Sequence, residues 1–320
     1  MNFEDVIKEA QDLLSENTEW KDRYANYADI FLANTNSIKS NRNRFNQFPP
    51  LYFYISTTNV KNAKSSLLLD IRYRGQSVAT LKANNNGIFI STKQQDVNNL
   101  RDFNCNIKLN DIAWQDKQVS EFRKFFKEKP YSRINGNNKK NEEHNVESLL
   151  LSEFSKRKSK SKQITGIQPV KICGNRFGMP TPLGASNHKT LKYASQNGGG
   201  IDIFARTGKG RATYLTVIEV KDENKSNEPP IDALKQAIQY AVFIRELLRS
   251  DCGEKWYKLF GFSGTIPKTL TIRSVCAMPD DYADKSFEKQ IYLIGDDKIE
   301  CHYIYFKYDG KQLFDFQTSL

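Results

Sequence analysis

Paired cysteines, long apolar runs and histidine motifs are all missing from this chain of 320 residues. The five cysteines are scattered and never form a C-x-x-C pair, so neither a disulfide framework nor a structural zinc site is expected, and a reducing cytoplasm fits best. No apolar run approaches the roughly 18 residues that span a bilayer, so export and membrane insertion are not expected.

The three histidines, His144, His188 and His302, are isolated from one another and from any H-E-x-x-H pattern. Metal binding or acid–base catalysis by histidine is therefore not expected. A serine or cysteine hydrolase is not expected either, because no histidine is placed to act as its general base. The phosphate-loop pattern G-x-x-x-x-G-K-[ST] is also absent, because Gly208-Lys209-Gly210 joins two expected strands and does not lead into a helix. ATP binding is not expected.

Basic residues outnumber acidic ones, 48 to 37, and the formal net charge is +11. A field of one sign steers oppositely charged ligands, and phosphate contacts dominate nucleic-acid affinity, so this excess favours a nucleic-acid partner. Lysines spread over a surface for solubility give the same total, and that alternative stays open. The basic run Lys156–Lys162 is equally consistent with a solvated loop and with phosphate contact.

Hydrophobic periodicity predicts a smaller N-terminal α+β domain over residues 1–130. Helical spacing over 4–33 predicts two helices or a helical hairpin, and a further helix is expected over 116–127. Between them, an antiparallel meander is predicted from the segments 51–56, 66–74, 77–83 and 87–91.

Residues 131–145 are rich in Asn, Lys, Gly and Glu and contain almost no apolar side chain, so they are predicted to be a linker. The second domain, 146–320, is predicted to be α/β with a mixed sheet. Its expected elements are an opening helix at 146–154, a strong helix at 231–249, and strands that include 270–277, 290–294, 299–307 and 312–317.

Two acidic residues and a lysine stand on neighbouring predicted strands of this second domain. Asp202 ends Gly198–Asp202, and Glu219 and Lys221 follow in Val217–Lys221. Side chains at i and i+2 leave a strand on the same face, so Glu219 and Lys221 are expected to share an exposed shelf.

The hairpin between these strands decides whether the two carboxylates meet. With the turn centred between Lys209 and Gly210, Asp202 faces Val217, and Glu219 is its diagonal neighbour at roughly 7–8 Å, close enough to share one cation. A slip of one residue would place the two carboxylates on opposite faces.

Carboxylates in this arrangement suit Mg²⁺ or Mn²⁺, which accept a few protein oxygens and keep water or substrate phosphate as further ligands. Lys221 could then orient a water molecule and stabilise developing charge, which is the chemistry of phosphodiester hydrolysis. A surface ion pair on an edge strand is the alternative interpretation of Glu219 and Lys221.

Two helices supply further candidates. Gln236 and Tyr240 are four residues apart on the helix 231–249, so they share a face and can reach a common target, although ordinary amphipathic helices carry such pairs. Glu147 stands at the start of the opening helix, where the helix dipole favours a carboxylate in any case, and Glu153 is the competing acid.

Taken together, Glu147, Asp202, the Glu219-Val220-Lys221 segment and the Gln236 to Tyr240 pair resemble the PD-(D/E)XK nuclease superfamily over residues 145–320. Ile201 stands where the name-giving proline would be. The resemblance implies a restriction-endonuclease-like αβββαβ core. It also implies metal binding by Asp202, Glu219 and the Val220 carbonyl, a water-orienting Lys221, and assistance from Glu147, Gln236 and Tyr240.

The resemblance further implies Mg²⁺-dependent cleavage of nucleic acid. The leading hypothesis is a cytoplasmic, Mg²⁺-dependent endonuclease that acts on DNA, in restriction or genome defence. DNA or RNA as the substrate and the formation of a homodimer stay open. The alternative hypothesis is a nucleic-acid-binding or assembly module that keeps the nuclease fold without cutting. For residues 1–130 three roles stay open, namely DNA reading, partner binding and dimer formation.

Overall fold

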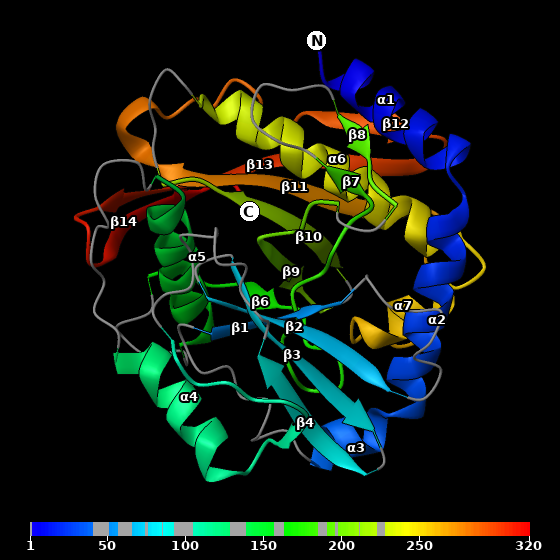
Figure 1. Cartoon of the computed structure of the whole chain (residues 1–320). Coiled ribbons are helices and arrows are strands. Elements are labelled where there is room, and N and C mark those ends of the chain that lie inside the picture. Colours follow the sequence, from blue (N-terminus) through cyan, green and yellow to red (C-terminus); the bar gives the residue numbers. More distant parts are fainter. Residues whose placement is uncertain are drawn as a thin grey trace.

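The computed structural model describes residues 2–40, 51–56, 66–73, 76–84, 86–92, 105–128, 139–156, 163–184, 191–195, 198–210, 212–222 and 228–320. Figure 1 shows two β-sheets with helices packed around them, and the larger sheet is mixed. The predicted α/β class with a mixed sheet is therefore confirmed. Most of the basic run, residues 157–162, lies outside the described residues.

The N-terminal helices form as their apolar spacing predicts, and a capping box begins the first. Asn2 Oδ1 accepts a hydrogen bond from Asp5 N at 2.8 Å, and Asp5 Oδ2 accepts one from Asn2 N at 3.3 Å. The three helices of this region are α1 (Phe3–Glu16), α2 (Glu19–Ala33) and α3 (Thr35–Ser40).

The predicted meander is confirmed as a sheet with the strand order β1-β2-β3-β4-β5, in which every neighbouring pair is antiparallel. Its strands are β1 (Leu51–Ile55), β2 (Leu67–Tyr73), β3 (Gln76–Asn84), β4 (Gly87–Thr92) and β5 (Ile112–Ala113). Helix α4 (Lys117–Glu128) buries Val119, Phe122 and Phe126, and the ring of Phe126 lies 4.8 Å from that of Tyr73 on β2.

The larger sheet has the order β12-β13-β11-β10-β9-β6, and β14 pairs with β13. Strands β6, β9 and β10 pair antiparallel in sequence, whereas β10, β11 and β13 are parallel. The elements are α5 (Lys139–Ser155), β6 (Ile167–Pro169), β9 (Ile203–Lys209), β10 (Ala212–Val220), α6 (Pro230–Arg249), α7 (Gly253–Leu259), β11 (Thr271–Pro279), β12 (Ile291–Ile294), β13 (Asp297–Tyr308) and β14 (Leu313–Thr318), with a small separate pair, β7 (Leu183–Gly184) and β8 (Lys192–Tyr193).

Alternating side chains of β9 and β10 bury two different faces. Ile203 and Ile218 belong to the core beneath α5, whereas Phe204 and Val217 belong to the core that contains the apolar residues of α6. The sheet is therefore covered by α5 on one face and by α6 on the other, as the alternation of a strand buried on both faces requires.

The N-terminal helices pack on the C-terminal half of the chain. Helix α1 lies along α6 in Figure 1, and Trp20 of α2 packs edge-on against Phe243 of α6 with ring centroids 5.7 Å apart. Trp256 of α7 donates a hydrogen bond from Nε1 to the Tyr24 carbonyl oxygen at 3.0 Å. One hydrophobic core thus continues from residues 3–126 into residues 170–305.

Helix α5 begins at Lys139, seven residues before the expected start at 146, and so takes up part of the predicted linker. The residues that extend it are polar, and hydrophobic periodicity gives no signal for such a turn. Residues 131–138 lie outside the described residues. None of the helices in the described part of the chain is long and apolar enough to cross a membrane.

Candidate metal centre

The β9–β10 hairpin brings Asp202 and Glu219 to the same end of the sheet. The predicted pairing of Asp202 with Val217 was wrong, because Phe204 faces Val217 and Ile203 faces Ile218. The closing pair is Lys209 with Ala212, so the turn lies one residue later than expected and the register moves by two. A shift of two residues keeps every side chain on its face, so Asp202, just before β9, still lies beside Glu219.

Three carboxylates converge here. One oxygen atom each from Glu143, Asp202 and Glu219 lies within 4.8 Å of the other two. Asp202 is oriented by its neighbour strand, because Val220 N donates a hydrogen bond to Asp202 Oδ2 at 2.8 Å. Glu219 Oε2 is buried and accepts no hydrogen bond. A buried carboxylate oxygen without a donor carries an uncompensated desolvation cost, which a cation would offset.

Lys221 lies among these acids. Its Nζ is 3.0 Å from Glu219 Oε1, 3.4 Å from Glu143 Oε1 and 3.6 Å from Glu228 Oε1. The expected exposed shelf was wrong, because Glu219 is 5% exposed and Lys221 3% exposed. The reason is tertiary, since the polar extension of α5 and the residue Glu228, just ahead of α6, both reach Lys221.

Burial and the repulsion between neighbouring carboxylates both raise the pKa values of Glu219 and Asp202. Burial raises the pKa of Glu219 to about 7, opposed by Lys221 and reinforced by Glu143. Desolvation and the negative charges of Glu219 and Glu143 raise the pKa of Asp202 well above its ordinary value. Burial by itself would lower the pKa of Lys221, but the surrounding carboxylates outweigh it and raise that pKa, so the ammonium stays charged.

Glu147, the acid expected from the opening helix, lies one turn further along α5 and is held by two basic side chains. Its Oε1 is 2.9 Å from Arg176 Nη2, and its Oε2 is 3.4 Å from His144 Nδ1. Burial would raise the pKa of Glu147, but hydrogen bonds from His144 and Arg176 lower it. Arg176 Nη2 also donates to the Asp202 carbonyl oxygen at 3.1 Å, so Glu147 is linked to the centre through Arg176.

Sequence reasoning missed Glu143, Arg176 and Glu228 at this centre. The signal for Glu143 was its i, i+4 relation to Glu147, which puts both on one face of a helix, but the helix had been expected to begin only at residue 146. Arg176 precedes β7 in a stretch without regular periodicity, and no sequence pattern pointed to it.

Gln236 and Tyr240 are both buried on α6. Tyr240 lies against the backbone that leads into Asp202, since a Cβ atom at Gly199 would sit 2.1 Å from the Tyr240 hydroxyl oxygen. Glycine at 199 therefore permits this close approach. The assisting roles of Gln236 and Tyr240 stay predictions.

The donor set fits a hard divalent cation. Two oxygens on opposite sides of a Mg²⁺ ion lie about 4.1 Å apart, because each Mg–O distance is roughly 2.0–2.1 Å. Three oxygens cannot all lie opposite one another, so at least two of the three distances would have to be shorter still, and the carboxylates would have to move closer together from their 4.8 Å limit to hold one ion. The three carboxylates and the one ammonium of Lys221 sum to a formal charge of −2, and Glu228, 3.6 Å from the same ammonium, adds a further negative charge, so the centre attracts a divalent cation.

No family model, curated protein or solved structure matches this chain.

Proposed function

We propose that this protein is a divalent-metal-dependent endonuclease that hydrolyses phosphodiester bonds in DNA. The observation that carries the proposal is the group of three carboxylates from α5, β10 and the residue before β9, of which Glu219 is buried and the other two are half-buried, with Lys221 in contact with two of them. Gathering like charges with an unsatisfied oxygen costs free energy unless a cation completes the site.

The element order is consistent with the αβββαβ core of the PD-(D/E)XK superfamily that the sequence resembles. Helix α5 precedes the antiparallel strands β6, β9 and β10, and α6 then connects β10 to the parallel strand β11. Asp202 lies just before the start of β9, and Glu219 and Lys221 lie at the end of β10, which supports the resemblance. We infer a restriction-endonuclease-like catalytic core on these grounds.

Glu143, Asp202 and Glu219 would hold Mg²⁺ or Mn²⁺, and the carbonyl of Val220 is the further ligand that the resemblance implies. The Val220 N–H already fixes Asp202 beside it. When bound, such an ion polarises a phosphoryl oxygen and lowers the pKa of a water molecule.

Lys221 supplies positive charge next to the reacting phosphate. Its Nζ keeps three N–H donors because its pKa is raised, and Glu219 and Glu143 hold the ammonium in place. A preorganised ammonium can orient the attacking water and stabilise the charge that develops on phosphate oxygens. Arg176 positions Asp202, because its Nη2 donates hydrogen bonds both to Glu147 and to the Asp202 carbonyl oxygen.

The excess of basic residues supports a nucleic-acid substrate. A formal charge of +11 attracts a polyanion and makes the association sensitive to salt. We infer a cytoplasmic enzyme with DNA as its substrate, and restriction or genome defence as its setting.

The test is cleavage of supercoiled plasmid, single-stranded DNA and RNA by purified protein in Mg²⁺, Mn²⁺ or EDTA. Wild type is expected to cut DNA only with metal. Glu219→Gln should abolish cutting, and the matched control Glu4→Gln, an exposed acid of α1, should cut like wild type. Cleavage in EDTA, or undiminished cleavage by Glu219→Gln, would overturn the proposal.

The same experiment separates the enzyme from a non-cleaving module with this fold. Such a module would bind DNA in a salt-sensitive manner, ignore EDTA and leave every substrate intact.

A further inference from the structure

A cavity with a volume of about 560 Å³ lies at the other end of the β9–β10 hairpin from the metal centre. This volume is within the range of roughly 300–1,000 Å³ that small-molecule sites occupy. Its walls come from both strands of the hairpin, from α7 and from the segment that leads into β11. The lining residues used below are Arg206, Tyr214, Tyr257, Phe262, Ser263 and Pro267.

The cavity is separate from the metal centre. Arg206 and Asp202 lie on the same face of one chain segment, four residues apart, which is about 13 Å along a strand. Phe204 lies between them and packs edge-on against Phe260 of the α7 C-terminus, with ring centroids 4.9 Å apart. Both rings are buried, so the sheet face between the two sites is closed by packed side chains.

Arg206 brings an uncompensated positive charge to this cavity. Its Nη1 donates to the Gly261 carbonyl oxygen at 2.8 Å, and its Nε has no hydrogen-bond partner. Within the described part of the chain, no carboxylate lies at ion-pair distance from Arg206. The neighbouring Arg273 differs, because Glu300 Oε2 lies 3.1 Å from its Nε. A guanidinium without a carboxylate partner favours an anion such as phosphate.

Flat aromatic rings form the other part of the wall. Tyr257 and Phe262 stack with ring centroids 4.6 Å apart and planes 12° apart, and the Arg206 guanidinium lies 5.8 Å from the Phe262 ring centroid. The Arg273 guanidinium lies over the Tyr214 ring, 4.6 Å from the ring centroid. Rings backed by guanidinium groups favour stacking with a planar heterocycle.

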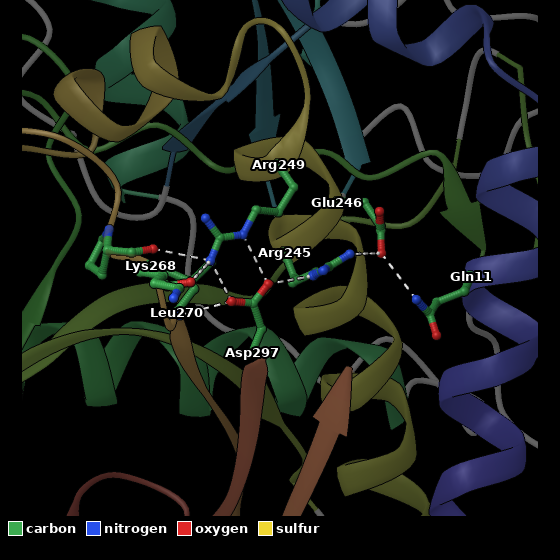
Figure 2. Close-up of polar contacts among 8 residues, drawn as sticks. Gln11, Arg245, Glu246, Arg249, Lys268, Leu270 and Asp297 are labelled. Atoms are coloured by element: carbon green, nitrogen blue, oxygen red, sulfur yellow. Dashed lines mark hydrogen bonds and ion pairs between the residues drawn. The ribbon is translucent and has the colours of Figure 1, made fainter. Parts of the chain in front are cut away.

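The wall that contains Pro267 is fixed in place by the ion-pair group in Figure 2. Arg249 Nη2 donates to the carbonyl oxygens of Lys268 and Pro267, at 2.9 and 3.1 Å. Asp297 Oδ1 accepts from Leu270 N at 2.8 Å, and its Oδ2 accepts from Arg245 Nε at 2.8 Å. The segment is thereby held against α6, so the cavity wall is ordered before any ligand binds.

We propose that this cavity binds one nucleotide, with its base against the aromatic wall and its phosphate at Arg206. The nucleotide is either a free molecule or one unit of a nucleic-acid strand, and both share this chemistry. Neither source requires the metal centre.

The test is isothermal titration of the full-length protein in EDTA with AMP, GMP, CMP and dTMP, and with adenosine, ribose 5-phosphate and inorganic phosphate as comparators. At least one nucleotide is expected to bind, with adenosine and ribose 5-phosphate at least about fivefold weaker, because base stacking and phosphate contact each contribute. No binding of any nucleotide, or equal binding of ribose 5-phosphate, overturns the inference.

Variants locate the ligand. Arg206→Gln and Phe262→Ala should each weaken binding at least about fivefold. Ser263→Trp, in the exposed loop after α7, should fill the cavity and abolish binding without touching the core. Lys8→Gln, an exposed cation of α1, is the matched control and should bind like wild type. Unchanged affinity in Arg206→Gln and Ser263→Trp, with unchanged circular dichroism, would overturn the assignment.

Two further measurements complete the test. A single-stranded oligonucleotide titrated into wild type and Ser263→Trp identifies a strand as the source if only the wild type binds tightly, and a free nucleotide as the source if both bind alike. Glu219→Gln should retain nucleotide binding. Loss of cleavage and loss of nucleotide binding are therefore separate results, and either proposal can fail alone.

Discussion

Replacing Glu219 with glutamine is expected to stabilise the metal-free protein while abolishing cleavage. Glutamine has nearly the shape of the protonated acid and removes one of three crowded negative charges. The pKa of Glu219 is raised to about 7 from an ordinary value of 4.5, so the folded state binds this proton more tightly than the unfolded state. Ionising Glu219 in the folded protein therefore costs on the order of 3 kcal/mol.

The favourable contribution of protonated Glu219 is fully present below pH 4.5 and is lost as the pH rises through about 7. At pH 8 in EDTA, Glu219→Gln should therefore unfold with a free energy about 3 kcal/mol higher than wild type, and at pH 4.5 the two should agree. For a chain of this size, ~3 kcal/mol corresponds to a melting temperature higher by roughly 4–5 °C.

The assay is thermal and urea unfolding at pH 8 and 4.5, in EDTA and in saturating Mg²⁺. Added Mg²⁺ should raise the melting temperature of wild type and have little effect on the variant, because a ligand stabilises only the state that binds it. Glu153→Gln is the matched control, since this buried acid of α5 already accepts a hydrogen bond from Gln163 N at 2.8 Å. The control should lose stability, because its change leaves donors without a charged acceptor.

A loss of stability in Glu219→Gln at pH 8 without metal would refute the reasoning, since it would mean that Glu219 is stabilised by its surroundings and not repelled by them. If Mg²⁺ stabilised wild type and Glu219→Gln equally, the assignment of Glu219 as a metal ligand would be refuted.

Three further predictions concern neighbouring groups. Lys221→Met should destabilise the metal-free protein by about 3–5 kcal/mol, because it strips a buried carboxylate cluster of its ammonium, and Mg²⁺ should restore part of the loss in urea unfolding. Glu143→Gln should weaken Mg²⁺ affinity in calorimetry by at least about tenfold, whereas Glu147→Gln should weaken it less, and the reverse order would contradict the geometry. Asp297→Asn should cost about 3 kcal/mol at pH 7. Burial alone would raise the pKa of Asp297, but hydrogen bonds from Arg249 and Leu270 lower it. The ionised Asp297 side chain therefore stabilises the protein fully above its pKa in the unfolded chain, and this stabilisation is lost as the pH falls through its pKa in the folded protein. The variant and wild type should therefore converge in acid, and a constant difference would refute this.

Hydrophobic periodicity predicted most elements of this fold, because burial of one face imposes a repeat that the sequence displays. The stripe of α6 and the alternation over β1 to β4 were both identified within one or two residues. The early turn of α5 was missed because it carries no apolar side chain, and its Glu143, which faces the site, has the same appearance in sequence as an acid that faces water.

The β9–β10 hairpin shows that the sequence predicted a turn more reliably than it predicted strand register. Gly208 and Gly210 indicated a turn, but their positions allow more than one closing pair, and the choice between these pairs shifts the register by two residues. Gly210 has φ of 59°, and the ladder closes between Lys209 and Ala212. Because the shift was even, the prediction that Asp202 and Glu219 share a face held although their exact partners did not.

Most helices and strands, the mixed α/β class and the position of two acids and a lysine at neighbouring strand ends could be predicted from the sequence alone. Those features depend on local spacing and on strand alternation, which are properties of short stretches of chain. Packing between elements was needed to show that Glu143 completes the acidic group, that Arg176 supports it, and that Arg206 lies over the ring of Phe262 in the loop after α7. These contacts join residues that are tens of positions apart in the chain, and packing between elements, which no local pattern encodes, brings them together.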